Sequence, residues 1–121
     1  MALTDDQLNL MDRTSEVHIA TRSDGKAIKT IIWIVVDDGK VYVRSVRGDS
    51  GRWYERALAD PNVTIHADSE TFDFLAIPVE DPAEIDAVTA ALRKKYPPGG
   101  SLDRMIRDEV LDTTLRLEPT D

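Results

Sequence analysis

Two Asp-Gly dipeptides, each between segments with strand-like sequence, constrain the fold of this chain more than any other feature. Asp24-Gly25 follows Glu16–Arg22, where apolar and polar residues alternate, and Asp38-Gly39 precedes Lys40–Val46, which is also expected to be a strand. Asp-Gly tolerates the positive φ of tight hairpin turns, and alternation is typical of a half-buried strand. Between the two turns, Ile28–Val36 is a nearly continuous β-branched run, which predicts one strand. We therefore expect these three strands to form an antiparallel meander.

Three further segments are predicted to be strands. Val63–Ala67 alternates between apolar and polar residues, Thr71–Val79 follows it after a short polar turn, and Val110–Leu117 carries alternate apolar residues near the C-terminal end. Short strands separated by turn signals favour a small barrel over a parallel sheet. The sequence thus predicts six strands.

Helices are expected between and around these strands. Thr4–Arg13 opens with a capping box, Arg52–Ala59 is stopped by a following Asp-Pro-Asn, and Pro82–Lys95 begins with proline at a position that helices tolerate. Ser101 is expected to cap a shorter helix through Arg107. The predicted fold is therefore mainly β, of the α+β kind: an antiparallel barrel with peripheral helices. The 121 residues are expected to form a single domain.

Composition excludes several classes of function. The chain has no cysteine, so disulfides, thiol catalysis and zinc-thiolate sites are excluded. The longest apolar run, Ile31–Val36, is too short to cross a membrane, and the N-terminal residues lack the pattern of a signal peptide. The net charge of −8 argues against non-specific nucleic-acid binding. We expect a cytoplasmic protein with no membrane or nucleic-acid partner.

One segment runs against the acidic charge of the whole chain. Residues 40–56 hold five basic and two acidic residues, a net +3, so the remainder of the chain carries −11. Guanidinium groups, hydroxyls and the free N–H groups at a helix start are the donors that anions prefer. The alternative is that these arginines pair with carboxylates elsewhere in the chain. The candidate anion site consists of Arg44, Ser45, Arg47, Ser50 and Arg52.

The period-two geometry of a strand separates two members of this site. Arg44 and Ser45 point to opposite faces of an extended chain. Arg44 and Arg47 can reach one ligand only if the chain bends near Val46 or Gly48. On loop position alone, Arg47 is preferred to Arg44, as is Arg52.

No other pattern in the sequence indicates chemistry. His18 and His66 occupy polar positions of predicted strands and have no neighbour at metal-ligand spacing, so no metal site is expected. The acidic residues between Glu70 and Asp86 are most simply a solvated face. Neither a nucleophile elbow nor a phosphate-binding P-loop is present. No catalytic side chain is therefore predicted.

The order of elements and the residues around the arginine-rich loop resemble the FMN-binding split-barrel superfamily. The similarity lies in Val41–Ser45, then Gly51–Tyr54, then Leu58–Val63, with Thr30–Val36 similar to the second strand. That superfamily includes pyridoxamine-phosphate-oxidase-like proteins and deazaflavin-dependent reductases. The greatest likeness is to a small bacterial family described only as a domain of unknown function.

The resemblance implies a split β-barrel that binds FMN or a deazaflavin, with the phosphate held by the residues of the candidate anion site. It places Trp53 or Trp33 against the ring or its tail, although core packing is the commoner role of tryptophan. Thr30 lies on the strand that contacts the ring edge in the superfamily. A homodimer with the cofactor between two chains is also implied, with Ile31–Val36 and Trp53-Tyr54 as seam residues.

Two function classes remain open at this stage. In the first, the protein is an oxidoreductase acting on a small molecule, and the chemistry belongs to a bound flavin or deazaflavin. In the second, it is a non-catalytic dimer that binds an anionic small molecule in the same basic pocket. Bound flavin would colour the purified protein yellow, which distinguishes the two classes.

Overall fold

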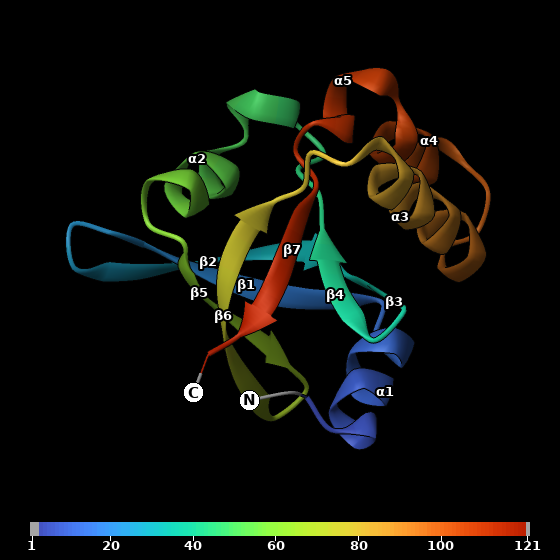
Figure 1. Ribbon diagram of the computed structural model, residues 1–121. Coiled ribbons are helices and arrows are strands. Elements are labelled where there is room, and N and C mark those ends of the chain that lie inside the picture. The colour runs from blue at the N-terminus through green and yellow to red at the C-terminus, as the bar shows by residue number, and fades with distance from the viewer. Residues whose placement is uncertain (1–2, 121) are drawn as a thin grey trace.

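Seven strands form one antiparallel sheet in the computed structural model, which describes residues 3–120. They are β1 (Glu16–Ser23), β2 (Lys26–Trp33), β3 (Val35–Asp37), β4 (Lys40–Val43), β5 (Asn62–Ala67), β6 (Glu70–Pro78) and β7 (Leu115–Pro119). Their order across the sheet is β2-β1-β5-β6-β7-β4-β3. β7 therefore lies between β6 and β4, as Figure 1 shows. The predicted mainly β architecture with antiparallel pairing is confirmed.

The number of strands was predicted wrongly, because Ile28–Val36 is not one strand. It is interrupted at Ile34, so that β2 pairs with β1 while β3 pairs with β4. β2 and β3 are the two opposite edges of the sheet, and only Ile34 separates them in the chain. The expected meander is therefore wrong as well: its two hairpins lie at opposite edges. The sheet curls into a half-barrel whose edges are joined by this kinked segment.

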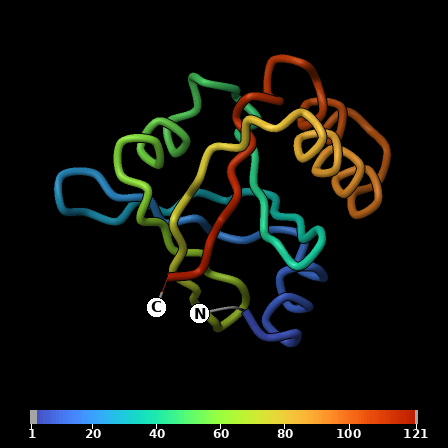
Figure 2. Tube along the Cα trace, viewed as in Figure 1, coloured from blue at the N-terminus to red at the C-terminus, as the bar shows by residue number. Residues whose placement is uncertain are grey.

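Both hairpins use the predicted turns. Asp24 and Gly25 have φ values of 52° and 76°, and Asp38 and Gly39 have values of 51° and 72°. Two successive residues with positive φ match the twist of antiparallel strands. Figure 2 shows the β1–β2 hairpin extending away from the rest of the molecule.

Polar groups from the C-terminal end of a helix hold the kink at Ile34. The Ile34 N–H donates to Tyr96 Oη (3.2 Å), and the Ile34 carbonyl accepts from Lys95 Nζ (2.6 Å). Lys95 Nζ also donates to the Met11 carbonyl at 2.9 Å. These bonds replace the ladder partners that the interrupted strand lacks, which a buried backbone needs.

Among the described residues, five helices and a short 3₁₀ turn pack around the sheet. They are α1 (Asp5–Arg13), η1 (Gly48–Ser50), α2 (Arg52–Ala59), α3 (Pro82–Lys95), α4 (Gly100–Ile106) and α5 (Asp108–Leu111). The three long helices confirm the sequence predictions, including the capping box at Thr4. In Figure 1, α2 lies on one side of β6 and β7, and α3, α4 and α5 gather on the other. This arrangement places α4 beside the loop after β4.

Two boundaries near the C-terminal end differ from the prediction. Gly99, not Ser101, is the N-cap of α4. The last strand begins at Leu115 rather than Val110, because residues 108–111 form α5. Thr113 Oγ1 and Thr114 Oγ1 donate to the carbonyls three residues back, at 2.6 and 2.7 Å. Such local bonds compete with a strand ladder and end the helix before the strand starts.

Two apolar cores support this arrangement. One fills the barrel between the sheet and the helices α1 and α2, with Met11, Ile65 and Leu117 among its buried residues. The other lies between β3–β4 and the helices α3 and α4, and includes Val88 and Leu102. The second core fixes α4 against the sheet and thereby forms one wall of a cavity.

Candidate functional site

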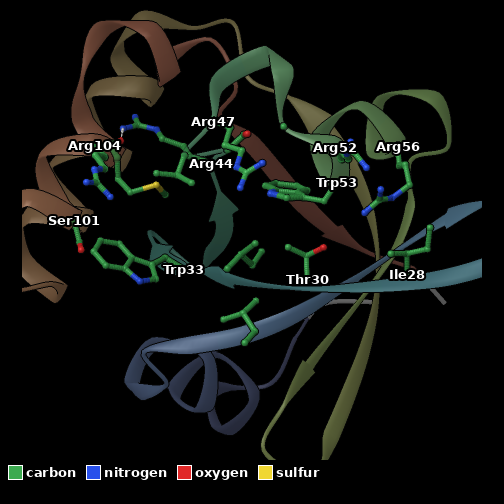
Figure 3. A pocket seen from close by; sticks show the side chains of 16 residues that line it. Ile28, Thr30, Trp33, Arg44, Arg47, Arg52, Trp53, Arg56, Ser101 and Arg104 are labelled. Carbon is green, nitrogen blue, oxygen red and sulfur yellow. Dashed lines mark hydrogen bonds between the residues drawn. The ribbon is translucent and has the colours of Figure 1, made fainter.

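A cavity of about 640 Å³ lies between β2, the loop after β4, the start of α2, and α4. This size falls within the range of about 300–1,000 Å³ that is usual for small-molecule sites. Figure 3 shows the side chains of Thr30 and Trp33 extending from β2 toward the loop and helices above. The lining residues are Ile28, Thr30, Ile31, Ile32, Trp33, Arg44, Ser45, Val46, Arg47, Gly51, Arg52, Trp53, Arg56, Ser101, Arg104 and Met105.

Arginine is the main charged component of the lining. Five of the residues around the cavity are arginines, and none of the lining residues is Asp or Glu. Four of the arginines come from the cationic segment of residues 40–56, and Arg104 comes from α4. In a chain with a net charge of −8, this lining attracts anions and repels cations.

Arg44 is buried at 2% exposure, and its guanidinium is already engaged by the protein. Its Nε donates to Thr114 Oγ1 (2.8 Å), its Nη1 to the Met105 carbonyl (3.1 Å), and its Nη2 to the Ile85 carbonyl (2.8 Å) and Thr89 Oγ1 (2.9 Å). Burial lowers the pKa of Arg44 to about 10, so the side chain stays charged at neutral pH. Arg44 therefore ties the end of β4 to α3, to α4 and to the residue before β7, and adds positive charge to the cavity lining.

Ser45, the next residue along the chain, also lines the cavity. The residue is 1% exposed, and its Oγ has no hydrogen-bond partner among the described residues. Its backbone N–H donates to Thr113 Oγ1 at 3.1 Å. A buried hydroxyl without a partner is costly and calls for an explanation. A ligand atom in the cavity would supply the missing partner.

Gly51 allows the chain to pass close to this hydroxyl. A Cβ added at Gly51 would lie 2.3 Å from Ser45 Oγ, far inside van der Waals contact. The φ of −65° at Gly51 suits any residue, so the requirement for glycine is steric rather than conformational. The small residue therefore lets the loop pack directly against the Ser45 hydroxyl.

Arg47, Arg52 and Arg56 surround the loop and the first turns of α2. Arg47 precedes the turn η1, Arg52 is the first residue of α2, and Arg56 follows one helical turn later. Arg56 Nε donates to Thr21 Oγ1 at 2.8 Å, which leaves its two terminal nitrogens unbonded by this contact. None of the ion pairs within residues 3–120 includes these three arginines. The alternative that they pair with carboxylates finds no support in this part of the chain.

Ser50 is not among the cavity residues. Its hydroxyl donates to the Arg47 carbonyl at 2.9 Å and thereby closes the turn η1. Of the seven predicted site residues, the structure brings Thr30, Arg44, Ser45, Arg47, Arg52 and Trp53 to one cavity and leaves Ser50 outside it.

Aromatic side chains complete the lining. Trp53 is 6% exposed and packs edge-to-face on Tyr54, at 6.2 Å between ring centroids. Trp33 stacks on Tyr96, with ring centroids 3.7 Å apart and planes at 3°. Figure 3 shows Trp53 and Thr30 on opposite sides of the cavity. A planar ring between them would contact an indole on one side and a hydroxyl on the other.

Sequence reasoning did not select four of the polar or flexible lining residues. They are Arg56, Ser101, Arg104 and Met105. Arg56 has a usable signal, because its spacing of four from Arg52 places both on one face of a helix. The other three belong to α4, which is more than forty residues away in the chain. Only the docking of α4 brings them to the cavity, and no local pattern encodes that docking.

A separate polar cluster lies at β4, β7 and α3. Tyr42 Oη donates to Glu84 Oε2 at 2.6 Å, and Arg116 Nη1 lies 2.8 Å from the same oxygen. Burial and the Glu84 contact raise the pKa of Tyr42. The Tyr42 hydrogen bond and Arg116 hold the pKa of Glu84 below its usual value. These residues do not line the cavity, so we assign the cluster to stability.

The histidines do not belong to the site, and the described helices include none that could span a membrane. His18 and His66 are cross-strand partners on β1 and β5, and neither lines the cavity. Within residues 3–120, no group of His, Asp or Glu side chains is arranged to hold a metal ion. In the same range, no helix has the length and hydrophobicity needed to cross a membrane.

The fold is similar to that of solved split-barrel proteins, as the sequence resemblance indicated. Residues 7–117 match the model of the family described as "uncharacterized protein conserved in bacteria" (DUF2255). The chain belongs to that family. None of the curated proteins matches it in sequence.

Solved structures with the same fold include proteins of different kinds. A putative pyridoxamine 5'-phosphate oxidase from Listeria innocua has 13% sequence identity and a TM-score of 0.72, over 97% of this chain and 93% of that chain. HutZ, the heme storage protein from Vibrio cholerae, has 19% identity and a TM-score of 0.72, over 100% of this chain and 92% of that chain. The FAD binding protein from Mycobacterium smegmatis has 19% identity and a TM-score of 0.68, over 98% of this chain and 92% of that chain. At such identities, the likeness establishes the fold alone.

Proposed function

We propose that this protein binds FMN or a deazaflavin in the arginine-lined cavity and acts as an oxidoreductase on a small molecule. The observation that carries the proposal is the cavity itself: five arginines, no carboxylate, and the unpartnered hydroxyl of Ser45. The same fold occurs in proteins described as an FAD binding protein and a putative pyridoxamine 5'-phosphate oxidase. Those descriptions make a flavin the first ligand to test.

The residues present fit the phosphate end of such a cofactor. Arg47 and Arg52 supply guanidinium donors, and the Ser45 hydroxyl supplies a buried donor that nothing else in the described chain uses. Arg44 acts through its charge and through the position that it gives to α4. Ser50 supports the site only through its bond to the Arg47 carbonyl.

Trp53 and Thr30 would contact the planar ring of the cofactor from opposite sides. The bound cofactor supplies the electron transfer in such enzymes. The cavity lining contains no Asp, Glu, His, Lys, Tyr or Cys. The contribution of the chain is therefore to bind, to orient, and to stabilise negative charge.

We also propose that the protein is a homodimer, although the expected seam needs a correction. Trp53 and Tyr54 are buried within one chain and cannot form a seam. The exposed apolar side chains beside the cavity are Ile28 (38%), Ile31 (58%) and Val46 (42%). A second copy that covered them would also cover the mouth of the cavity. Light scattering should then give about twice the 13.5 kDa of one chain, and a mass near 13.5 kDa would contradict the dimer.

The binding test is a titration of FMN, and separately of a deazaflavin, into wild type, Arg47→Ala and Arg52→Ala. Loss of one charge-assisted contact should weaken binding about ten- to a hundredfold, and higher salt should weaken it further. Arg93→Ala is the matched control, because Arg93 is exposed on α3 and does not line the cavity. If both ligands fail to bind wild type, the oxidoreductase proposal fails.

The second candidate is a non-catalytic protein that binds an anionic small molecule in the same cavity. It is favoured by the absence of acid–base side chains from the cavity lining. Heme is a less suitable ligand, because no histidine lines the cavity to ligate the iron. A colourless protein that binds inorganic phosphate or a carboxylate, but no flavin, would support this candidate.

A further inference from the structure

The arginines of the cavity lie at more than one end of it. Figure 3 shows Arg52 and Arg56 at one end, beside Ile28, and Arg104 and Ser101 at the other, beside Trp33. Ser101 and Arg104 are three residues apart on α4, and this spacing puts them on one face of the helix. The α4 end is therefore a second polar region, formed by a different part of the chain from the loop assigned to the cofactor phosphate.

The indole of Trp33 gives this end a fixed aromatic surface. One face of Trp33 is covered by the stacked ring of Tyr96, and the residue also lines the cavity. Tyr96 is itself held, since its hydroxyl donates to the Ser15 carbonyl at 2.6 Å and accepts from the Ile34 N–H at 3.2 Å. A planar ligand that stacks on Trp33 would therefore meet a surface that needs no reordering.

The backbone that carries Arg104 is also fixed. The next residue, Met105, is buried at 5% exposure, and its carbonyl accepts from the buried Arg44 at 3.1 Å. The nearest ion pair on the following segment joins Arg107 to Glu109 and does not involve Arg104. Among the described residues, no carboxylate neutralises the Arg104 guanidinium, although its backbone is held in one place.

We propose that Trp33, Ser101 and Arg104 form the substrate end of the cavity and bind a planar molecule with a carboxylate. The ring of the substrate stacks on Trp33, and its carboxylate accepts hydrogen bonds from Arg104 and Ser101. This inference rests on the proposed function, because it assigns the end of the cavity that the cofactor phosphate does not occupy. It restricts the substrates to conjugated or aromatic carboxylic acids and excludes cations.

The test uses 2-naphthoate and its neutral isostere 2-naphthamide as probes, with binding measured by calorimetry. Arg104→Ala should weaken binding of naphthoate about tenfold. This is the lower end of the range expected for loss of a charge-assisted hydrogen bond, because Arg104 is exposed. Binding of naphthamide should not change. Arg93→Ala, on the exposed surface of α3, is the control and should leave both affinities as in wild type.

Two comparisons separate the failure of this inference from that of the proposed function. Arg52→Ala should weaken FMN binding and leave naphthoate binding unchanged, and naphthoate should bind to the FMN-loaded protein. If FMN fails to bind but naphthoate binding depends on Arg104, the subsite stands and the flavin proposal falls. If Arg104→Ala changes naphthoate and naphthamide binding equally, or if FMN displaces naphthoate, the subsite is overturned.

Discussion

Replacement of Ser45 by alanine should change stability and ligand binding in opposite directions. In the ligand-free protein, the Ser45 hydroxyl is buried without a partner among the described residues, and such a group costs about 1–3 kcal/mol. Removal of one oxygen also loses a few dispersion contacts of about 0.1–0.2 kcal/mol each. The free energy of unfolding should therefore stay constant or rise by about 1 kcal/mol, which corresponds to about 4 °C in the melting temperature.

A second hydroxyl in the same region provides the matched control. Thr113 is also fully buried, but its Oγ1 accepts from the Ser45 N–H at 3.1 Å and donates to the Val110 carbonyl at 2.6 Å. Thr113→Val leaves the Ser45 N–H unpaired, so it should lower the free energy of unfolding by about 1–3 kcal/mol. Two buried hydroxyls in contact with the same loop should thus respond with different signs.

The assay is urea denaturation of protein whose spectrum shows no bound chromophore, with an unchanged m-value as the sign of two-state behaviour. The same Ser45→Ala protein should bind FMN about tenfold more weakly than wild type. A loss of more than about 1 kcal/mol in the ligand-free Ser45→Ala protein would refute the reasoning. The hydroxyl would then have a partner in the folded protein and would not be reserved for a ligand.

Three further outcomes follow from contacts described above. Gly51→Ala should lower the free energy of unfolding by about 1–3 kcal/mol in denaturation experiments, and by less in the Ser45→Ala background, where the colliding oxygen is gone. Burial lowers the pKa of Lys95 to about 8 from 10.5, so the unfolded chain binds more protons between these values. Stability should therefore rise with pH across this window, and the Lys95→Met protein should lack that rise. The pKa of Glu84 is held below its usual 4.5, so ionised Glu84 contributes to the free energy of unfolding above that pH, and the contribution is lost as the pH falls. In a plot of the free energy of unfolding against pH, Glu84→Gln should therefore reduce the slope at acidic pH.

Local signals in the sequence were sufficient for the turns and for the long helices. Asp24-Gly25 and Asp38-Gly39 determine their own backbone conformation, because few other pairs tolerate two positive φ values. Pro82 and the basic residues before Tyr96 delimit α3 in the same local way. Such predictions succeed because the physical cause lies within a few residues.

The elements whose bounds were predicted wrongly depend on contacts between residues that are distant in the chain. Ile34 is apolar and β-branched, so nothing local marks it as a break; the break is stabilised by Lys95 and Tyr96, some sixty residues later. The candidate site divides in the same way. Arg47 and Arg52 follow from local charge, whereas Arg104 reaches the cavity only because α4 docks beside it.

The central position of β7 has a consequence for the time at which the cavity can exist during synthesis. β7 completes the sheet between β6 and β4, and the residues just before it anchor the segment that follows β4: Thr113 Oγ1 accepts from the Ser45 N–H, and Thr114 Oγ1 accepts from Arg44 Nε. A ribosome that has made the first hundred residues has produced most of the arginines but none of these two anchors. Chains grow from the N-terminus at about 5–20 residues per second. A molecule that binds in this cavity could therefore assist folding only after residues 113–119 have left the ribosome.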